Sequence, residues 1–323
     1  MKIEFKRFVP GLLLAFLVLL GLTLFGDIRQ VSDTLLHFNW SVYPFVILLT
    51  IFNYSLRFIK WNYYLKLIGV KDLSKRDSLR IFLAGFPLAV TPGKIGEALK
   101  GVWVNKESGV PVGRAISVVA AERISDGLGV LVLSTIGVIA YPKYWPGFLF
   151  VLVILVSVVI LTQIRPLAMA ILSFGEKLPL INKFTGGIRE FYEGSFSLFQ
   201  PKSTITGVGL GVVSWFGEGI GFFLILVGLG LPAELEPLSI AVFVLSFSTI
   251  IGAVSALPGG LGAAELTIAG MLVFIARIDP ATASSATVLI RLATLWFGVG
   301  LGLAIWAVSP RLLGLKGNHA NVH

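Results

Sequence analysis

Long apolar runs, separated by short polar stretches, follow one another along nearly the whole chain. Each run approaches the ~20 residues that an α-helix needs to cross the hydrocarbon core of a bilayer. We therefore predict an all-α polytopic membrane protein with a single transmembrane domain over residues 1–323. Six full spans are expected, at about residues 9–25, 42–68, 114–140, 147–164, 205–230 and 283–308.

The first run also resembles the start of a targeting segment, because Lys2, Lys6 and Arg7 precede it. No small-residue cleavage site follows the run, and the next polar stretch carries Asp27 and Asp33. We interpret it as the first span, with a signal anchor as the alternative.

Two further apolar stretches, at about 79–105 and 238–276, are each interrupted by a Pro-Gly signature. The signatures are Thr91-Pro92-Gly93-Lys94-Ile95-Gly96-Glu97 and Leu257-Pro258-Gly259-Gly260-Leu261-Gly262, the second followed by Glu265. The arms on either side are about 12–15 residues long, which is short of a full span. We therefore expect two re-entrant pairs of half-helices. Arms that each cross the membrane, giving ten spans, are the alternative.

Basic residues are unevenly distributed over the predicted loops. Nineteen Lys and Arg residues fall on one side of the predicted membrane, and only Arg29, Lys143 and Arg277 fall on the other. The positive-inside rule then predicts a multi-pass protein of the cytoplasmic (inner) membrane with both termini in the cytoplasm. The net charge of +9 is thus an excess in cytoplasmic loops and does not indicate nucleic-acid binding.

With this topology the first hairpin opens toward the cytoplasm and the second toward the outside. That opposite orientation predicts an inverted-topology repeat, a recurring design for alternating access, with one repeat at about 42–140 and the other at about 205–308. The segment at about 166–203 between them predicts an amphipathic helix on the cytoplasmic surface. Its apolar face would carry Phe184, Ile188, Phe191, Tyr192, Phe196 and Phe199. We expect a structural connector, with a regulatory or partner-docking role as the alternative.

The amino-acid composition excludes several kinds of chemical site. Only 13% of the residues are charged and 56% are hydrophobic, about half the charged fraction of a soluble domain. The chain has no cysteine, which excludes disulfides and thiolate metal sites, and its three histidines fall in predicted loops or the tail. A nucleotide-binding loop of the G-x-x-x-x-G-K-[ST] kind is absent, so we expect no ATP hydrolysis, no cofactor and no metal.

Nine charged residues lie at predicted membrane depth, where each costs at least ~2.5–3.5 kcal/mol on insertion scales. They are Arg57, Lys94, Glu97, Glu122, Arg123, Asp126, Glu218, Glu265 and Arg291. Such groups should face a cavity or one another. Sequence spacing predicts pairing of Arg123 with acids of its own helix, and of Lys94 with Glu97 on the half-helix after the first break. Asn53, Arg57 and Lys60 form a polar stripe on the second span.

The two breaks suggest an anion site. A half-helix that begins in mid-membrane presents free amides and a positive dipole end, and glycine lets a ligand approach the backbone. We expect amides at Gly93, Gly96, Gly259, Gly260 and Gly262 to join the four buried cations in binding a phosphate, because arginine bonds phosphate bidentately. A phosphate at that depth indicates a lipid headgroup in transit. The alternative is that the ion pairs only hold helices together.

These motifs resemble a known family. The Pro-Gly-Lys-Ile-Gly-Glu signature, the cluster Glu122-Arg123-x-x-Asp126 and the later Pro-Gly-Gly-Leu-Gly-x-x-Glu265 are similar to the membrane region of lysylphosphatidylglycerol synthases, which also occurs alone as flippase-like integral membrane proteins. The resemblance covers essentially the whole chain. It implies the lipid-translocating half without the aminoacyl transferase domain of the bifunctional synthases.

We therefore expect a lipid translocase, a flippase or scramblase, for an anionic phospholipid or a polyprenyl-phosphate-linked lipid. It would not be an enzyme and would have no catalytic residues. Two alternatives stay open: a membrane-embedded transferase that uses a polyprenyl-phosphate donor, and a small-anion transporter. The expected partners are the lipid substrate and the bilayer. A homodimer and a separate lipid-modifying enzyme also stay open.

Overall fold

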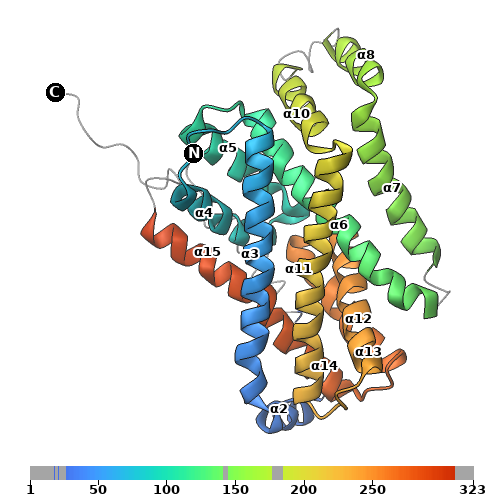
Figure 1. Ribbon diagram of the computed structural model, residues 1–323. Helices are drawn as coiled ribbons and strands as arrows, with labels where there is room; N and C mark the ends of the chain where they lie inside the picture. The colour runs from blue at the N-terminus through green and yellow to red at the C-terminus, as the bar shows by residue number, and fades with distance from the viewer. Residues whose placement is uncertain (1–17, 19–20, 22–26, 141–144, 177–184, 310–323) are drawn as a thin grey trace.

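The computed structural model describes residues 27–140, 145–176 and 185–309, together with the isolated positions 18 and 21. All regular structure in this part of the chain is helical (Figure 1), which confirms the predicted all-α class. The predicted first span, residues 9–25, lies outside the described residues apart from those two positions.

The helices follow the apolar runs closely. The α-helices are α2 (Ile28–His37), α3 (Tyr43–Leu67), α4 (Lys75–Ala84), α5 (Leu99–Ser108), α6 (Val112–Ala140), α7 (Trp145–Gln163), α8 (Arg165–Glu176), α10 (Thr185–Leu198), α11 (Pro201–Gly228), α12 (Leu235–Val254), α13 (Ala263–Phe274), α14 (Pro280–Arg291) and α15 (Phe297–Val308). Short helical turns join them: the 3₁₀ turns η2 (Trp40–Val42), η3 (Phe86–Val90), η4 (Pro92–Ala98) and η6 (Pro258–Gly260), and the π-helical turn η7 (Leu292–Trp296) between α14 and α15.

Five stretches of the described chain are long and apolar enough, by length and composition, to cross a membrane. They are Trp40–Leu67, Trp145–Gln163, Pro201–Gly228, Leu235–Val254 and Pro280–Val308. The helix α6 is also long enough at 29 residues, but it carries the charged cluster. The predicted arm length is wrong for α12, because this helix has 20 residues. The second interrupted stretch therefore joins one full-length helix to the 12-residue α13.

Two parts of the chain repeat the same order of elements. A Pro-Gly break, a short helix and a 29-residue helix occur first as η4, α5 and α6. They recur as η6, α13 and the continuous run α14–η7–α15, which also spans 29 residues, 280–308. The two long helices begin and end at an interval of 168 residues. The chain order supports an internal repeat, and its inverted orientation in the membrane stays a prediction.

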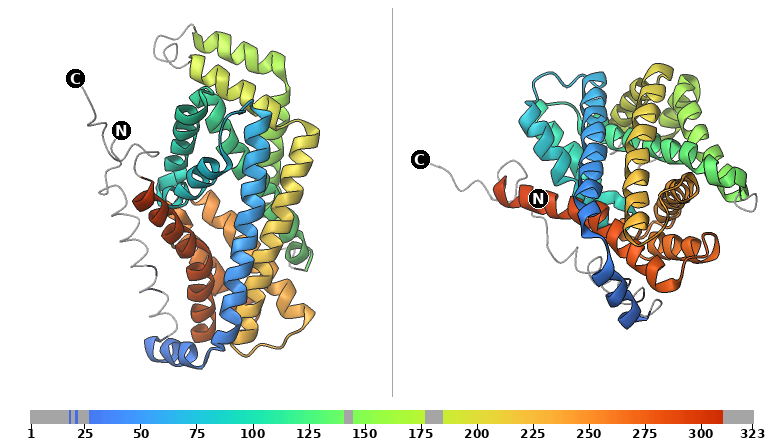
Figure 2. Two further views of the ribbon diagram at one scale, coloured as in Figure 1. Left: turned by 60° about the vertical axis from the view of Figure 1, so that its left-hand side comes forward. Right: turned by 60° about the horizontal axis from the view of Figure 1, so that its bottom comes forward.

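The described residues form two large apolar cores and one small cluster. The first large core is formed mainly by α11, α12, α13, α14 and the second half of α6. The second lies where the end of α3 and the start of α6 meet α4, α5 and α10. Along α6, buried Ala121 belongs to one core and Val130 to the other. Glu122, Arg123 and Asp126 of α6 lie between them. The helices α3 and α11 run side by side past both cores (Figure 2), so their charges reach the same layer.

The predicted amphipathic connector is only partly as expected. The helix α10 packs along the first turns of α6, where Arg114 Nη2 lies 2.7 Å from Glu190 Oε2. Tyr192 is buried in that contact, whereas Ile188 and Phe191 are exposed. Part of the predicted apolar face is therefore buried in the protein, and the rest is exposed on its surface. Phe184 lies outside the described residues.

Candidate functional site

The two Pro-Gly breaks meet in the interior. The backbone N–H of Gly93 donates to the carbonyl oxygen of Ala256 at 2.9 Å, which joins the first break directly to the second. Val90 and Leu261 pack together beside this contact, against Leu295. The segments that the sequence singled out 166 residues apart are thus neighbours in space.

Both breaks contain two successive residues in the left-handed region. In the second break these are Gly259 and Gly260, with φ of 63° and 67°. In the first they are Gly93 and Lys94, with φ of 60° and 57°. A side chain in this conformation costs roughly 1–2 kcal/mol, which glycine avoids. Lys94 therefore adopts a backbone conformation that costs free energy, and residues with such strain are frequent at functional sites.

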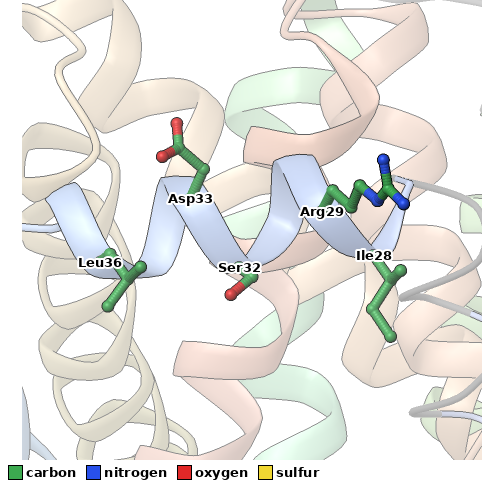
Figure 3. A pocket seen from close by; sticks show the side chains of 5 residues that line it. All are labelled: Ile28, Arg29, Ser32, Asp33 and Leu36. Carbon is green, nitrogen blue, oxygen red and sulfur yellow. The ribbon is translucent and has the colours of Figure 1, made fainter.

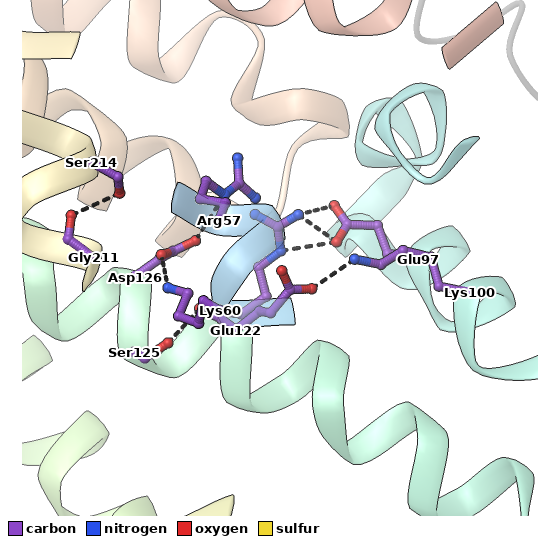
Figure 4. Close-up of polar contacts among 10 residues, drawn as sticks. Arg57, Lys60, Glu97, Lys100, Glu122, Ser125, Asp126, Gly211 and Ser214 are labelled. Atoms are coloured by element: carbon purple, nitrogen blue, oxygen red, sulfur yellow. Dashed lines mark hydrogen bonds and ion pairs between the residues drawn. The ribbon is translucent and has the colours of Figure 1, made fainter. Parts of the chain in front are cut away.

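The central ion pair joins α3 to α6. Asp126 accepts a short hydrogen bond from Lys60, and its other oxygen lies 3.4 Å from Arg57 Nε (Figure 4). Lys60 and Asp126 are both buried. The far end of the Arg57 guanidinium points away from this carboxylate in Figure 4. Arg57 donates no hydrogen bond among the described residues, so it retains donors for another group.

A second buried pair joins α5 to α6. Lys100 Nζ donates to Glu122 Oε2 at 2.7 Å and lies 4.5 Å from the centre of the Trp61 ring, a cation–π contact. Lys60 and Lys100 are two of the nineteen basic residues predicted on the cytoplasmic side, and both are buried within α3 and α5, where they pair with acids of α6. The signal for Lys60 was the polar stripe that it forms with Asn53 and Arg57, which are also buried.

Each repeat contributes an equivalent Glu–Arg pair. Arg123 binds Glu97 through two nitrogens, with Nε donating at 2.9 Å and Nη2 more closely. Arg291 Nε donates to Glu265 Oε1 at 2.5 Å, and its Nη2 donates to the carbonyl of Gly259 at 3.1 Å. In both pairs the arginine follows the glutamate by 26 residues. We call these pairs the two Glu–Arg clamps.

The predicted local pairings are wrong. Arg123 bonds to Glu97 of η4 instead of to Glu122 or Asp126 of its own helix, and those two acids pair with lysines of other helices. Lys94 makes no ion pair with Glu97 either, because the backbone is left-handed at Gly93 and Lys94 and the two side chains do not lie on one regular helix. Long-range partners replace neighbours because several elements converge on one charged layer.

Four of the five break glycines do not offer free amides as predicted, whereas the Gly259 amide has no hydrogen-bond acceptor among the described residues. Gly96 N–H donates to Thr91 Oγ1 at 2.9 Å, Gly260 N–H to the Leu257 carbonyl at 2.9 Å, and Gly262 N–H to Glu265 Oε2 at 2.7 Å. The amide of Gly93 is occupied by the contact between the breaks. In this conformation these glycines shape the backbone, and side chains supply the donors for an anion.

The predicted cations converge on one place. Lys94 lies within electrostatic reach of Arg57, Arg123 and Arg291, and of the one acid Glu97. Its ammonium group makes no hydrogen bond or ion pair among the described residues. Like charges repel, so a cluster of this kind is stabilised by an anion between them. The Arg123 side chain is 33% exposed although its partner Glu97 is buried, so the clamp presents its arginine outward.

The described layer holds six cations, counting Lys60 and Lys100, and five acids. Four of the acids, all except Glu218, bind one of these cations. Glu218 on α11 is 5% exposed and has no partner among the described residues. The layer therefore carries a net formal charge of +1 with Glu218 ionised and +2 with it protonated.

A separate surface hollow of about 440 Å³ lies on α2 and is lined by Ile28, Arg29, Ser32, Asp33 and Leu36 (Figure 3). All five residues come from this one exposed helix, and none belongs to the charged layer. Over the described ranges, no group of three or more His, Cys, Asp or Glu side chains is arranged to hold a metal ion.

Comparison with known proteins places the chain in a family. The model of the lysylphosphatidylglycerol synthase TM region matches residues 12–302. The chain belongs to this family. Two UPF0104 membrane proteins of Methanothermobacter thermautotrophicus are 26% and 23% identical to it, each alignment covering 90% of both chains. A UPF0104 membrane protein of Methanocaldococcus jannaschii is 22% identical over 98% of this chain and 99% of that relative. As a member of the lysylphosphatidylglycerol synthase TM family with membrane-length helices, the chain is an integral membrane protein.

Proposed function

We propose that this protein is a lipid translocase that moves an anionic phospholipid or a polyprenyl-phosphate-linked lipid across the cytoplasmic membrane. The observation that carries the proposal is the convergence of Arg57, Lys94, Arg123 and Arg291 on the charged layer between the two apolar cores. Membrane helices rarely place charges at this depth unless the charges serve a substrate or ion pathway. The proposal assigns transport to the site and no bond-breaking chemistry.

The depth of the site supports a lipid over a water-soluble ligand. Arg57, Arg123 and Arg291 each lie near the middle of a long helix, and the two apolar cores flank them. A lipid phosphate crossing the bilayer must pass the region where it is least well solvated. Guanidinium and ammonium donors at that point replace the lost water, because charge-assisted hydrogen bonds to phosphate are the strong ones.

The proposal places the movement that transport requires at the two Pro-Gly breaks. The proposal treats the two repeats as inverted, with one hairpin opening to each side and both termini in the cytoplasm. The Glu–Arg clamps would then hold the two hairpins, and movement of one repeat against the other would expose the cations alternately to the two leaflets. A lipid phosphate competes with Glu97 for Arg123, and with Glu265 for Arg291. Exchange of these partners would couple binding to movement.

The test is native mass spectrometry of the gently solubilised full chain. Lys94 is the best residue to change, because Arg123 and Arg291 each neutralise a buried acid and their removal would leave a carboxylate unpaired. Lys94→Gln is compared with wild type and with Lys71→Gln, an exposed lysine that serves as a charge-matched control.

The proposal predicts that wild type and Lys71→Gln retain an anionic phospholipid or a polyprenyl phosphate, and that Lys94→Gln loses most of it. The mass of the retained species identifies the lipid class. Equal retention by Lys94→Gln and wild type would count against the phosphate site. Retention of a small anion in place of a lipid would favour a small-anion transporter, and a retained lipid that the purified protein converts to product would favour an embedded transferase.

A further inference from the structure

Glu218 is the one acid of the described charged layer that has no cation bound to it. It lies on α11 between Gly217 and Gly219, is 5% exposed, and neither accepts a hydrogen bond nor forms an ion pair within the described residues. The other four acids of the layer each bind an arginine or lysine at hydrogen-bond distance. Glu218 therefore differs from the other four acids of the layer, because no bound cation balances its charge.

The groups that face Glu218 do not neutralise it by direct contact. Arg57 and Tyr54 of α3, Asp126 of α6 and Arg291 of α14 all act on its charge. Arg57 and Arg291 already lie against Asp126 and Glu265, and the Tyr54 hydroxyl donates to the Thr294 carbonyl at 2.6 Å. The remaining packed helix, α12, brings no charged side chain except Glu236, in its exposed first turn.

An ionised carboxylate in such a place is strongly disfavoured, because no donor replaces the water that burial removes. Protonation removes this penalty. Around Glu218 the helix α11 packs closely against α3, since a Cβ added at Gly217 would lie 3.0 Å from Phe52. Intramembrane acids with these surroundings serve as proton carriers in transport proteins.

We propose that Glu218 is the proton-binding site of this protein and that it takes up a proton when a lipid phosphate binds at Arg57. This inference rests on the proposed function. The phosphate adds a negative charge near Glu218, so the carboxylate and a proton from water combine to a carboxylic acid as the lipid arrives. The acid returns the proton when the lipid leaves. Because coupling is reciprocal, protonated Glu218 also binds the lipid more tightly.

The test measures how lipid affinity depends on pH. Phosphatidylglycerol is titrated into the solubilised full chain from about pH 5 to about pH 9, a range in which its phosphodiester stays singly charged. A parallel titration at one fixed pH uses a polyprenyl phosphate, because this phosphomonoester itself loses a second proton at about pH 6. It shares the phosphate chemistry and distinguishes the two lipid sources. The proteins are wild type, Glu218→Gln and Glu234→Gln, an exposed glutamate that serves as the matched control.

Wild type and Glu234→Gln should bind phosphatidylglycerol roughly tenfold more weakly at the high end of the range, a usual size for coupling between sites. Glu218→Gln, a neutral isostere, should keep the low-pH affinity throughout. If Glu218→Gln retains the wild-type pH dependence, another group such as Lys94 is responsible and the inference is wrong. A wild-type affinity that does not change with pH would also overturn it.

Two further results separate this inference from the proposed function. If wild type binds neither lipid at any pH, the proposed function fails and the inference falls with it. If Glu218→Gln does not fold, proton uptake by wild type on addition of phosphatidylglycerol in weak buffer decides the question. Uptake approaching one proton per bound lipid supports the inference, and uptake near zero contradicts it.

Discussion

Lys94 offers a prediction in which stability and function change in opposite directions. Its backbone is left-handed, with φ of 57°, and the equivalent position of the second break is Gly260. Its ammonium group makes no hydrogen bond or ion pair in the described part of the chain and lies within electrostatic reach of three arginines and Glu97. We compare Lys94→Gly with Lys94→Ala, because both remove the charge and only glycine relieves the backbone.

The expected magnitudes follow from these two features. Glycine relieves roughly 1–2 kcal/mol of left-handed strain and loses about 0.4–1 kcal/mol through the greater freedom of the unfolded chain. Lys94→Gly should therefore be more stable than Lys94→Ala by about 0.5–1 kcal/mol. Of the two variants, Lys94→Ala should stay close to wild type in stability, because the change removes a cation that three arginines repel and that Glu97 attracts. Both should bind lipid phosphate about tenfold to a hundredfold more weakly, the loss of one charge-assisted hydrogen bond.

Thermal unfolding in detergent, followed through the seven tryptophans, measures the order of stability. Lipid titration by native mass spectrometry measures the affinity, with Lys71→Gly as the control for an exposed lysine. If Lys94→Ala is as stable as Lys94→Gly, the lysine backbone is not strained. If either variant binds lipid as well as wild type does, Lys94 does not contact the phosphate.

Three further predictions test the packing, the clamps and the topology. Gly302→Ala should destabilise the protein by about 1–3 kcal/mol in thermal unfolding, because the added Cβ would lie 2.2 Å from Pro87. In the control Gly300→Ala the added Cβ meets no atom within 4 Å, so this change should be nearly neutral. Equal effects of the two changes would contradict the contact. Arg291→Gln and Glu265→Gln should each cost about 3–5 kcal/mol, and the double variant should cost clearly less than their sum; additive losses would mean that the clamp is not formed. Single cysteines at the exposed positions Ile95 and Leu266, in this cysteine-free chain, should react with a membrane-impermeant thiol reagent from opposite sides; reaction of both from one side would refute the inverted repeat.

Apolar patterning predicted the long helices well, because each must match the thickness of the bilayer. The predicted span 42–68 is α3 at Tyr43–Leu67, and the predicted span 283–308 falls within the 29-residue run 280–308. The same signal could not show where a helix ends inside a continuous apolar stretch. It therefore missed that α12 has 20 residues and that 3₁₀ turns separate α4 from α5.

The residue types of the charged layer were predictable from their cost in a membrane, but their partners were not. Sequence spacing identifies neighbours within one helix, whereas Lys60 and Asp126 are 66 residues apart and Lys100 and Glu122 come from different helices. Lys60 and Lys100 lie near the ends of apolar runs, where basic residues usually reach water, so their positions did not indicate that both are buried. The hydrogen bonds of the glycines at the two breaks were not predictable either, because they depend on how the two repeats pack against each other.

Lipid translocation by the purified protein tests the central claim most directly. Wild type, Lys94→Gln and Lys71→Gln are reconstituted into phosphatidylcholine vesicles that carry a fluorescent phosphatidylglycerol or a fluorescent polyprenyl phosphate, and an impermeant quencher reports the fraction in the outer leaflet over time. We expect wild type and Lys71→Gln to exchange at least one of these lipids between leaflets well above the rate of protein-free vesicles, and Lys94→Gln to lose most of that rate. If wild-type protein that retains the lipid in native mass spectra leaves both lipids in their original leaflets, the translocase proposal is contradicted.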